Sequence, residues 1–196
     1  MLSVVVLISG SGSNLRALLE AASRDGAGYR IIGVGADSDA SGLNHAREFG
    51  VPTFVVSPKD FDNREAWATA LLAQVQAFNT DLVVLAGFMR ILPGVFVNAL
   101  TPGLINMHPA LLPLYPGAHA VRDALAAGAT VTGATVHIVD EGVDTGPIIR
   151  QVEVAIEPTD TEETLHERIK VVERDLIVAT VTAIAQSQVN LEEIAR

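Results

Sequence analysis

The sequence of 196 residues contains no cysteine and only two lysines, Lys59 and Lys170. The absence of cysteine excludes disulfides, thiolate nucleophiles and cysteine-ligated metals. No apolar run approaches the roughly 20 residues that a membrane-spanning helix needs. The apolar run from Val4 to Ile8 has the length of a strand and no basic lead-in, so it predicts a buried strand and not an export signal. Together these absences favour a cytoplasmic protein.

Positive charge is also scarce, since 13 basic residues face 23 acidic ones and give a net charge of −10. Such a surface repels nucleic acid, which needs clustered basic residues. An anionic small molecule must therefore be held by backbone N–H groups or by single arginines. Hydrophobic residues make up 49% and charged residues 18%, which excludes disorder and predicts one globular domain. The apolar content also suggests a homodimer, without locating its interface.

Apolar runs of strand length alternate with amphipathic segments along the first half of the chain. Strands are predicted over residues 4–9, 31–36, 53–56, 82–86 and 103–107, and helices over residues 15–22 and 43–49. Asp62 and Glu65 form a capping-box pattern at the start of a third helix. Two β-branched runs, 131–139 and 148–156, predict an antiparallel hairpin, and a long helix is expected to begin at Asp160 with Glu163. The order predicts a single-domain α/β protein with a Rossmann-like sheet, parallel in its N-terminal half and antiparallel at its C-terminal edge.

A glycine-rich segment, Ser9–Asn14, lies between the first strand and the first helix. Its glycines allow a tight turn, and the helix N-terminus behind it offers free N–H groups to a phosphate. The third glycine of the dinucleotide fingerprint is replaced by Leu15, and no P-loop lysine follows. The segment therefore predicts a phosphate site of neither nucleotide-binding type, and a ligand-free turn is the alternative.

Asn106 and His108 lie at the end of a predicted strand, and strand alternation places both on one face. Such a pair can donate two hydrogen bonds to one developing oxyanion, although a single histidine at a strand end is often structural. The acidic turn 140–147 is either a solvated hairpin loop or the source of an acid for His108. His108, His137 and Asp144 match no local metal-ligand motif, so no metal site is predicted.

Four segments of the sequence together resemble the glycinamide ribonucleotide transformylases, a folate-dependent family of phosphoribosylglycinamide formyltransferases. The resemblance runs from Val4 to about Ala185 and rests on residues 4–14, 85–92, 106–113, and 133–137 with 144–147. The Asn-x-His-Pro and Asp-x-Gly-Pro motifs mark folate formyl-transfer proteins, and the glycine loop and residues 85–92 narrow the resemblance to this family. It implies one formyltransferase domain over residues 1–196, with a phosphate-binding half at about 1–100 and a folate-binding and catalytic half at about 101–196.

The resemblance implies transfer of a formyl group from 10-formyltetrahydrofolate, a cosubstrate, to the amine of 5-phosphoribosylglycinamide in purine (IMP) biosynthesis. It implies no permanently bound cofactor and no metal, and it implies the two small molecules as binding partners, with neither nucleic acid nor membrane. A deformylase-like hydrolase is one alternative, although a regulatory domain is expected before its core. A non-catalytic phosphate-sugar or folate-binding protein is the other, and the joint presence of Asn106, His108 and Asp144 argues against it.

The same resemblance assigns residues to three roles. The catalytic set is Asn106, His108 and Asp144. The ribonucleotide site is Gly12, Ser13, Asn14, Lys170, Val171, Val172 and Glu173, with Glu173 on the ribose hydroxyls. The folate site is Arg64, Met89, Arg90, Ile91, Leu92, Asn106, Asp140, Glu141, Gly142, Val143 and Asp144. Two positions depart from the family, because Ala110 replaces a frequent serine and Leu114 a frequent lysine or other polar residue.

The chemistry implied is attack of an amine on the formyl carbon, which creates a negative oxygen that Asn106 and protonated His108 would stabilise. Asp144 is expected to raise the pKa of His108, and the proton is expected to be carried by His108 or by a water that Asp144 holds. The proline-rich segment 108–117 predicts a cis peptide bond before Pro113 or Pro116.

Overall fold

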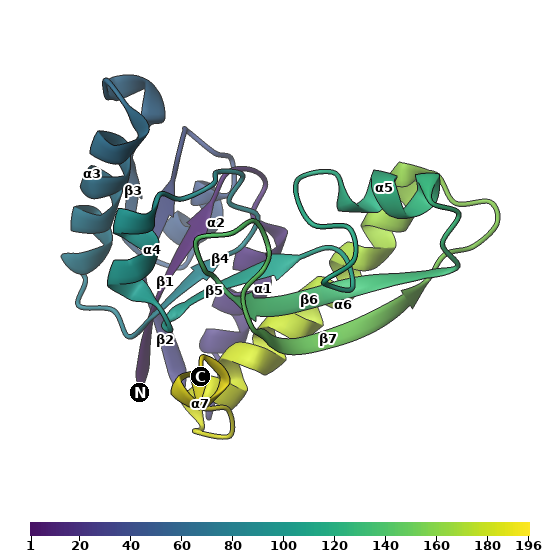
Figure 1. Ribbon diagram of the computed structural model, residues 1–196. Coiled ribbons are helices and arrows are strands. Elements are labelled where there is room, and N and C mark those ends of the chain that lie inside the picture. Colours follow the sequence, from purple (N-terminus) through teal and green to yellow (C-terminus); the bar gives the residue numbers. More distant parts are fainter.

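The computed structural model describes all residues from Met1 to Arg196 and is built on one seven-stranded sheet (Figure 1). Its strands are β1 (Leu2–Ile8), β2 (Tyr29–Ala36), β3 (Thr53–Val55), β4 (Leu82–Leu85), β5 (Leu104–His108), β6 (Val131–Ile138) and β7 (Ile148–Ala155). The strand order is β3-β2-β1-β4-β5-β6-β7. Pairs from β3 to β5 are parallel, whereas β5–β6 and β6–β7 are antiparallel. The predicted mixed sheet is confirmed.

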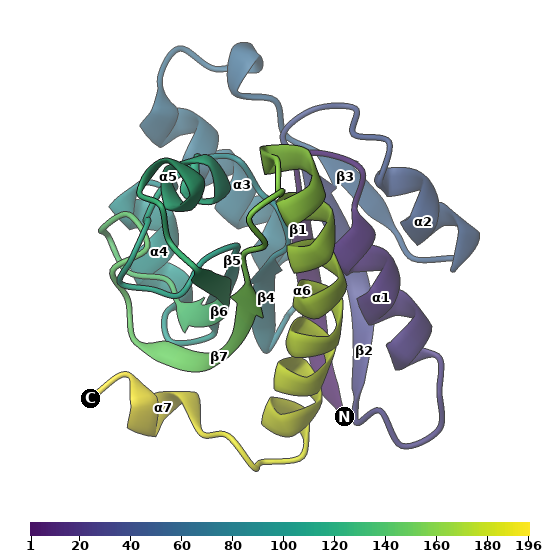
Figure 2. The ribbon, with the colours of Figure 1, turned by 90° about the vertical axis from the view of Figure 1, so that its right-hand side faces the viewer.

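Helices cover both faces of the sheet (Figure 2). They are α1 (Ser13–Ala22), α2 (Leu43–Glu48), α3 (Arg64–Gln76), α4 (Gly94–Leu100), α5 (Ala120–Ala126), α6 (Glu162–Ala185) and α7 (Leu191–Ile194), with a 3-10 turn at Pro58–Asp60. Val4 and Val6 of β1 pack in one core with α1, α2 and α6. Val5 and Leu7 pack in a second core with α3 and α4. Burial on both faces explains why β1 is a continuous apolar run from Val4 to Ile8.

The ends of two helices differ from the prediction. Helix α3 is capped by Asn63, whose Oδ1 accepts from the N–H of Ala66 at 2.9 Å, so the capping box of Asp62 and Glu65 is wrong. Thr161 caps α6 in a capping box with Thr164. Helices α4 and α5 were not predicted, because seven residues each are too few to show a helical period.

The topology brings three functional segments to one edge of the sheet. Strands β1, β4 and β5 are parallel, so the glycine loop, residues 86–92 and His108 all lie at carboxyl ends on this edge. The segment that follows β5 crosses β6 so closely that a Cβ at Gly133 would lie 2.6 Å from Leu111. The Leu112–Pro113 bond in this segment is cis, as predicted, and Thr101–Pro102 is also cis. None of the helices combines the length and apolarity needed to cross a membrane.

Candidate active site

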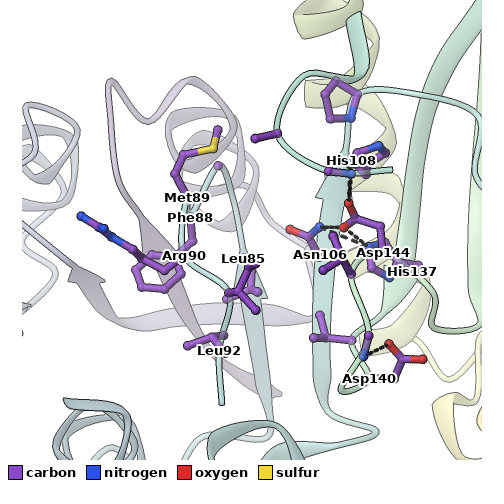
Figure 3. A pocket seen from close by; sticks show the side chains of 18 residues that line it. Leu85, Phe88, Met89, Arg90, Leu92, Asn106, His108, His137, Asp140 and Asp144 are labelled. Atoms are coloured by element: carbon purple, nitrogen blue, oxygen red, sulfur yellow. Dashed lines mark hydrogen bonds and ion pairs between the residues drawn. The ribbon is translucent and has the colours of Figure 1, made fainter. Parts of the chain in front are cut away.

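A cavity of about 270 Å³ opens at this edge of the sheet (Figure 3). Its lining is Leu85, Gly87, Phe88, Met89, Arg90, Ile91, Leu92, Asn106, His108, Pro109, Gly117, Ala118, His137, Val139, Asp140, Gly142, Val143 and Asp144. All three predicted catalytic residues are included, and so are all predicted folate residues except Arg64 and Glu141. Both halves of the chain line the cavity, with Leu85 to Leu92 from the first half and Asn106 to Asp144 from the second.

His108, the last residue of β5, is buried and has an acceptor beside each ring nitrogen. Its Nδ1 lies 3.3 Å from Oδ2 of Asp144, and its Nε2 donates to the carbonyl oxygen of Tyr115 at 2.8 Å. Burial lowers the pKa of His108; Asp144 and the Tyr115 carbonyl act in the opposite direction, and His137 adds to the lowering. Asp144 therefore acts on the pKa of His108 in the predicted direction. The predicted net rise of this pKa is wrong, because desolvation outweighs the effect of Asp144.

Asp144 connects the segment 109–118 to the buried polar side chains. Its Oδ2 accepts from the N–H of Gly117 at 2.7 Å, and its Oδ1 lies 3.5 Å from Nε2 of His137. Burial raises the pKa of Asp144, but the contacts with His137 and Gly117 and the charge of His108 lower it to a net value below the ordinary range. The carboxylate is therefore ionised at neutral pH and holds a negative charge against His108.

Asn106 is fixed by His137, a residue that the sequence analysis considered only as a metal ligand. The two face each other across β5 and β6, with Nδ2 of Asn106 3.1 Å from Nε2 of His137. Nδ1 of His137 donates to the carbonyl oxygen of Ile138 at 2.9 Å, so in the neutral ring Nε2 is the acceptor. The second hydrogen of the Asn106 amide points to Asp144 at 3.4 Å, and the amide oxygen lies on the cavity side (Figure 3). The sequence does contain a sign of this role, because His137 is an ionisable residue within the otherwise uncharged β6.

The N-terminus of α1 provides free backbone N–H groups behind the glycine loop. Gly12 caps the helix with φ of 73°, and neither a side-chain cap nor a first-turn acid occupies these groups. Nδ2 of Asn14 donates to Oε2 of Glu173 on α6 at 3.4 Å, and Oδ1 of Asn14 has no partner. Burial raises the pKa of Glu173, while Asn14 and nearby cations act in the opposite direction. The fold thus joins a loop and a helix that are 159 residues apart.

Not every residue of the predicted stretch 170–173 faces this loop. Val171 is exposed, and Val172 packs against the first core. Lys170 shares a helical face with Glu173 at a spacing of three residues, and its Nζ donates to Glu167 at 2.6 Å. Among residues 170–173, only Lys170 and Glu173 are therefore expected to contact a ligand at the glycine loop through their side chains.

Arg64 and Glu141 contribute from outside the cavity wall. Nη2 of Arg64 donates to the carbonyl oxygen of Ile91 at 2.6 Å, which supports the segment 89–92. Oε1 of Glu141 accepts from Asn98 of α4 at 2.6 Å, so its side chain anchors the acidic turn. Asp140 holds the same turn by accepting from the hydroxyl of Thr145 at 2.8 Å.

The two departures from the family lie beside the cavity segment 109–118. Ala110 is fully buried and its carbonyl oxygen accepts from the hydroxyl of Thr135 at 2.6 Å, whereas Leu114 is exposed. The contacts of these residues do not explain either departure. Across the chain, no group of three or more histidine, aspartate or glutamate side chains is arranged to hold a metal ion. Instead, the Asp144 carboxylate lies 3.3 Å from Nδ1 of His108 and 3.5 Å from Nε2 of His137.

Comparison with known proteins decides the family. The profile of the formyl transferase family matches residues 2–181. The chain belongs to this family. The phosphoribosylglycinamide formyltransferase of Mycobacterium tuberculosis is 52% identical over 182 residues, which cover 93% of this chain and 84% of the relative. That of Escherichia coli is 37% identical over 193 residues, which cover 98% and 91%.

Solved structures agree with this assignment. The glycinamide ribonucleotide transformylase 1 of Symbiobacterium toebii superposes with a TM-score of 0.92 at 40% identity, covering 95% of this formyl transferase and 89% of the other chain. The predicted family and the predicted formyltransferase fold are therefore confirmed.

Proposed function

We propose that this formyl transferase moves the formyl group of 10-formyltetrahydrofolate to the amine of 5-phosphoribosylglycinamide, giving the N-formyl product and tetrahydrofolate in purine biosynthesis. The observation that carries this proposal is the placement of Asn106, His108 and Asp144 in one cavity, on the sheet edge that also holds the open N-terminus of α1. Relatives named phosphoribosylglycinamide formyltransferase, at up to 52% identity, favour this reaction over hydrolysis and over binding alone.

The folate occupies the cavity in this proposal. Residues 89–92 present backbone N–H and C=O groups to the pterin from one side, and the turn 140–144 closes the other side. The formyl group then lies against Asn106 and His108, where the strand β5 ends. The folate is a cosubstrate that leaves after each turnover, and no metal or permanently bound cofactor takes part.

The ribonucleotide occupies the neighbouring loop. Its phosphate accepts from the N–H groups at residues 12–14, and Lys170 supplies a positive charge one turn of α6 from the ribose site. Glu173, already aligned by Asn14, accepts from the ribose hydroxyls. This arrangement directs the amine toward the formyl carbon.

The reaction proceeds by attack of the amine nitrogen on the formyl carbon, which places a negative charge on the formyl oxygen. That charge favours the imidazolium form of His108, which stabilises the oxygen by charge and hydrogen bonding. The attacking nitrogen loses a proton and the departing folate nitrogen gains one, carried by His108 or by a water held by Asp144. Nε2 of His108 donates to Tyr115 in the structure, so the segment 109–118 must release this nitrogen when the substrates bind.

Asn106 supports the same step from the same strand as His108. Its amide oxygen faces the cavity and can accept a hydrogen from the attacking amine. Donation to the formyl oxygen requires the amide to release Asp144, which at 3.4 Å is the longer of its two contacts.

One assay tests this function against both alternatives. Purified protein is incubated with 10-formyltetrahydrofolate and 5-phosphoribosylglycinamide, and the products are separated, identified and quantified by mass spectrometry. Formylated ribonucleotide with an equal amount of tetrahydrofolate is the expected result. Free formate as the main product would indicate a hydrolase, and binding without turnover would indicate a non-catalytic protein.

The proposal extends to assembly and location. We infer a homodimer from the high apolar content, and sedimentation equilibrium over a range of concentrations tests it; a monomer mass throughout would contradict it. A cytoplasmic location is expected from the composition, and fractionation of the cells of origin tests that expectation.

A further inference from the structure

The segment that lines the folate side of the cavity carries an ion pair directed away from it. Nε of Arg90 donates to Oδ2 of Asp37 at 2.5 Å. Asp37 directly follows β2, and its side chain is 3% exposed, whereas that of Arg90 is 47% exposed. Figure 3 shows the Arg90 side chain pointing away from the catalytic residues. The proposed folate site uses only the backbone of Arg90, so the ion pair of its side chain makes no direct contact with the folate.

The two partners depend on each other unequally. A buried carboxylate without a partner is strongly unfavourable, and the second oxygen of Asp37 already has none. Arg90 is half exposed, so water can solvate its guanidinium in other positions. Asp37 therefore holds Arg90 in place, and not the reverse. The position of residue 90 is tied in this way to the end of β2.

Neighbouring residues of the same segment are anchored to other elements. The N–H of Met89 donates to the hydroxyl of Ser9 after β1 at 2.8 Å, and the carbonyl oxygen of Ile91 accepts from Arg64 of α3 at 2.6 Å. The segment itself belongs to no helix or strand, so contacts of this kind define its conformation. Among the three anchors, only that of Arg90 pairs two charges, and only its partner Asp37 is buried.

We propose that Asp37 is a positioning residue for the folate cosubstrate. By holding Arg90, it keeps the backbone groups of residues 89–92 in the geometry that receives the pterin. Asp37 lies outside the cavity lining, and its role is indirect. The inference rests on the proposed folate site, and on nothing in the ribonucleotide site.

The variant Asp37→Asn tests this without leaving a buried charge unpaired. Asparagine keeps the size and one acceptor but removes the charge, while Arg90 can turn to water. We expect the Kd for tetrahydrofolate and the KM for 10-formyltetrahydrofolate to rise about tenfold, the scale of one charge-assisted hydrogen bond. The KM for the ribonucleotide and kcat at saturating folate should stay within about twofold, because the catalytic residues and the glycine loop are untouched.

Asp81→Asn is the control for loss of an aspartate charge elsewhere in the sheet. Asp81 lies at the opposite edge of the sheet, where its Oδ2 accepts from the N–H of Ser3 at 2.8 Å. Its loss should change the unfolding temperature and leave the Kd for tetrahydrofolate at the wild-type value. If Asp37→Asn fails to fold, Arg90→Gln removes the positive charge but keeps an amide donor for the Asp37 carboxylate, and it should give the same folate-selective loss.

Calorimetric titration with tetrahydrofolate separates the two proposals, because it requires no turnover. Wild-type protein that binds tetrahydrofolate but does not transfer formyl would overturn the proposed function and leave this inference intact. Wild-type protein that binds no folate would overturn both. A folded Asp37→Asn protein with wild-type folate affinity, or with equal losses for both substrates, would overturn the role of Asp37 alone.

Discussion

Replacing Asp144 with asparagine tests the central electrostatic contact of the site. The carboxylate lies 3.3 Å from Nδ1 of His108, and both side chains are largely buried. At an effective dielectric constant of about 20, opposite unit charges at that distance attract by about 5 kcal/mol. Asparagine has nearly the same size but no charge, so it removes this attraction while it retains an acceptor for the N–H of Gly117.

The expected effect is a fall in kcat of roughly 10²–10⁴-fold, or about 2.7–5.4 kcal/mol, with small changes in both KM values. The electrostatic attraction is large enough to account for that range. Burial already lowers the pKa of His108, and Asp144 is the largest opposing influence. Its removal lowers the pKa further, so the imidazolium form is lost at a lower pH. The alkaline limb of the pH–kcat profile should therefore shift toward lower pH in the variant.

Steady-state kinetics from pH 5 to 9 and an NMR titration of His108 measure these effects. Asp123→Asn is the control, because Asp123 is exposed, pairs with Arg122 and lies outside the cavity. His108→Asn should reduce kcat at least as much as Asp144→Asn. The double variant should lose less than the product of the two single effects, because the residues act as a unit.

Near-normal turnover of Asp144→Asn would refute the catalytic role of the Asp144 charge. The acidic turn 140–147 would then have a structural role only. A large rise in KM with unchanged kcat would also contradict it. That outcome would show that Asp144 acts by holding the segment 109–118 through Gly117 and not by its charge on His108.

Three further predictions concern the rest of the site. A Cβ at Gly42 would lie 2.8 Å from the Gly10 carbonyl oxygen and 3.0 Å from the Gly12 Cα, so Gly42→Ala should displace the glycine loop. The KM for the ribonucleotide should then rise roughly 10- to 100-fold, while the Kd for tetrahydrofolate, measured by calorimetry, should stay unchanged. Burial raises the pKa of Glu173 in the folded protein above its value in the unfolded chain, near 4.3. The free energy of unfolding therefore falls as the pH rises from that value through the folded pKa, because the folded state resists ionisation of this carboxyl. Glu173→Gln should therefore melt higher than wild type at pH 8 by calorimetry, converge with it near pH 4, and bind the ribonucleotide more weakly. Exhaustive chelation with EDTA should leave the measured turnover unchanged.

The sheet was predictable because β1 from Val4 to Ile8 and the whole of β4 carry apolar residues at every position. Both faces of these strands are buried, so hydrophobicity alone marks them, and their parallel pairing follows from the helices between them. Asn106 and His108 were also predictable, since alternation places them on one face whatever the packing. Helix α4 was missed because its seven residues have too little periodicity. The cap Asn63 was missed because the adjacent Asp62 is an equally good N-cap residue.

The partners of the site residues depend on pairings that no local pattern contains. His137 meets Asn106 only because β6 runs antiparallel to β5 in one register; a shift of one residue would turn it to the other face. Asp37 meets Arg90 because β2 and β4 both flank β1, which brings their carboxyl ends near one another. Both contacts join residues more than 30 positions apart, so the sequence could supply the residue types but not the pairs.

The pKa of His108 shows why chemistry was harder to predict than geometry. The acid predicted to raise it is present and does raise it, yet the net shift is downward. The deciding quantity is burial, which depends on how tightly the segment 109–118 covers the end of β5. That segment donates to Asp144 from Gly117 and accepts from His108 at Tyr115, so the same contacts that bury the imidazole also hold its nitrogens. If substrates displace this segment, desolvation and hydrogen bonding at His108 change together, and the protonation state for catalysis is set only after binding.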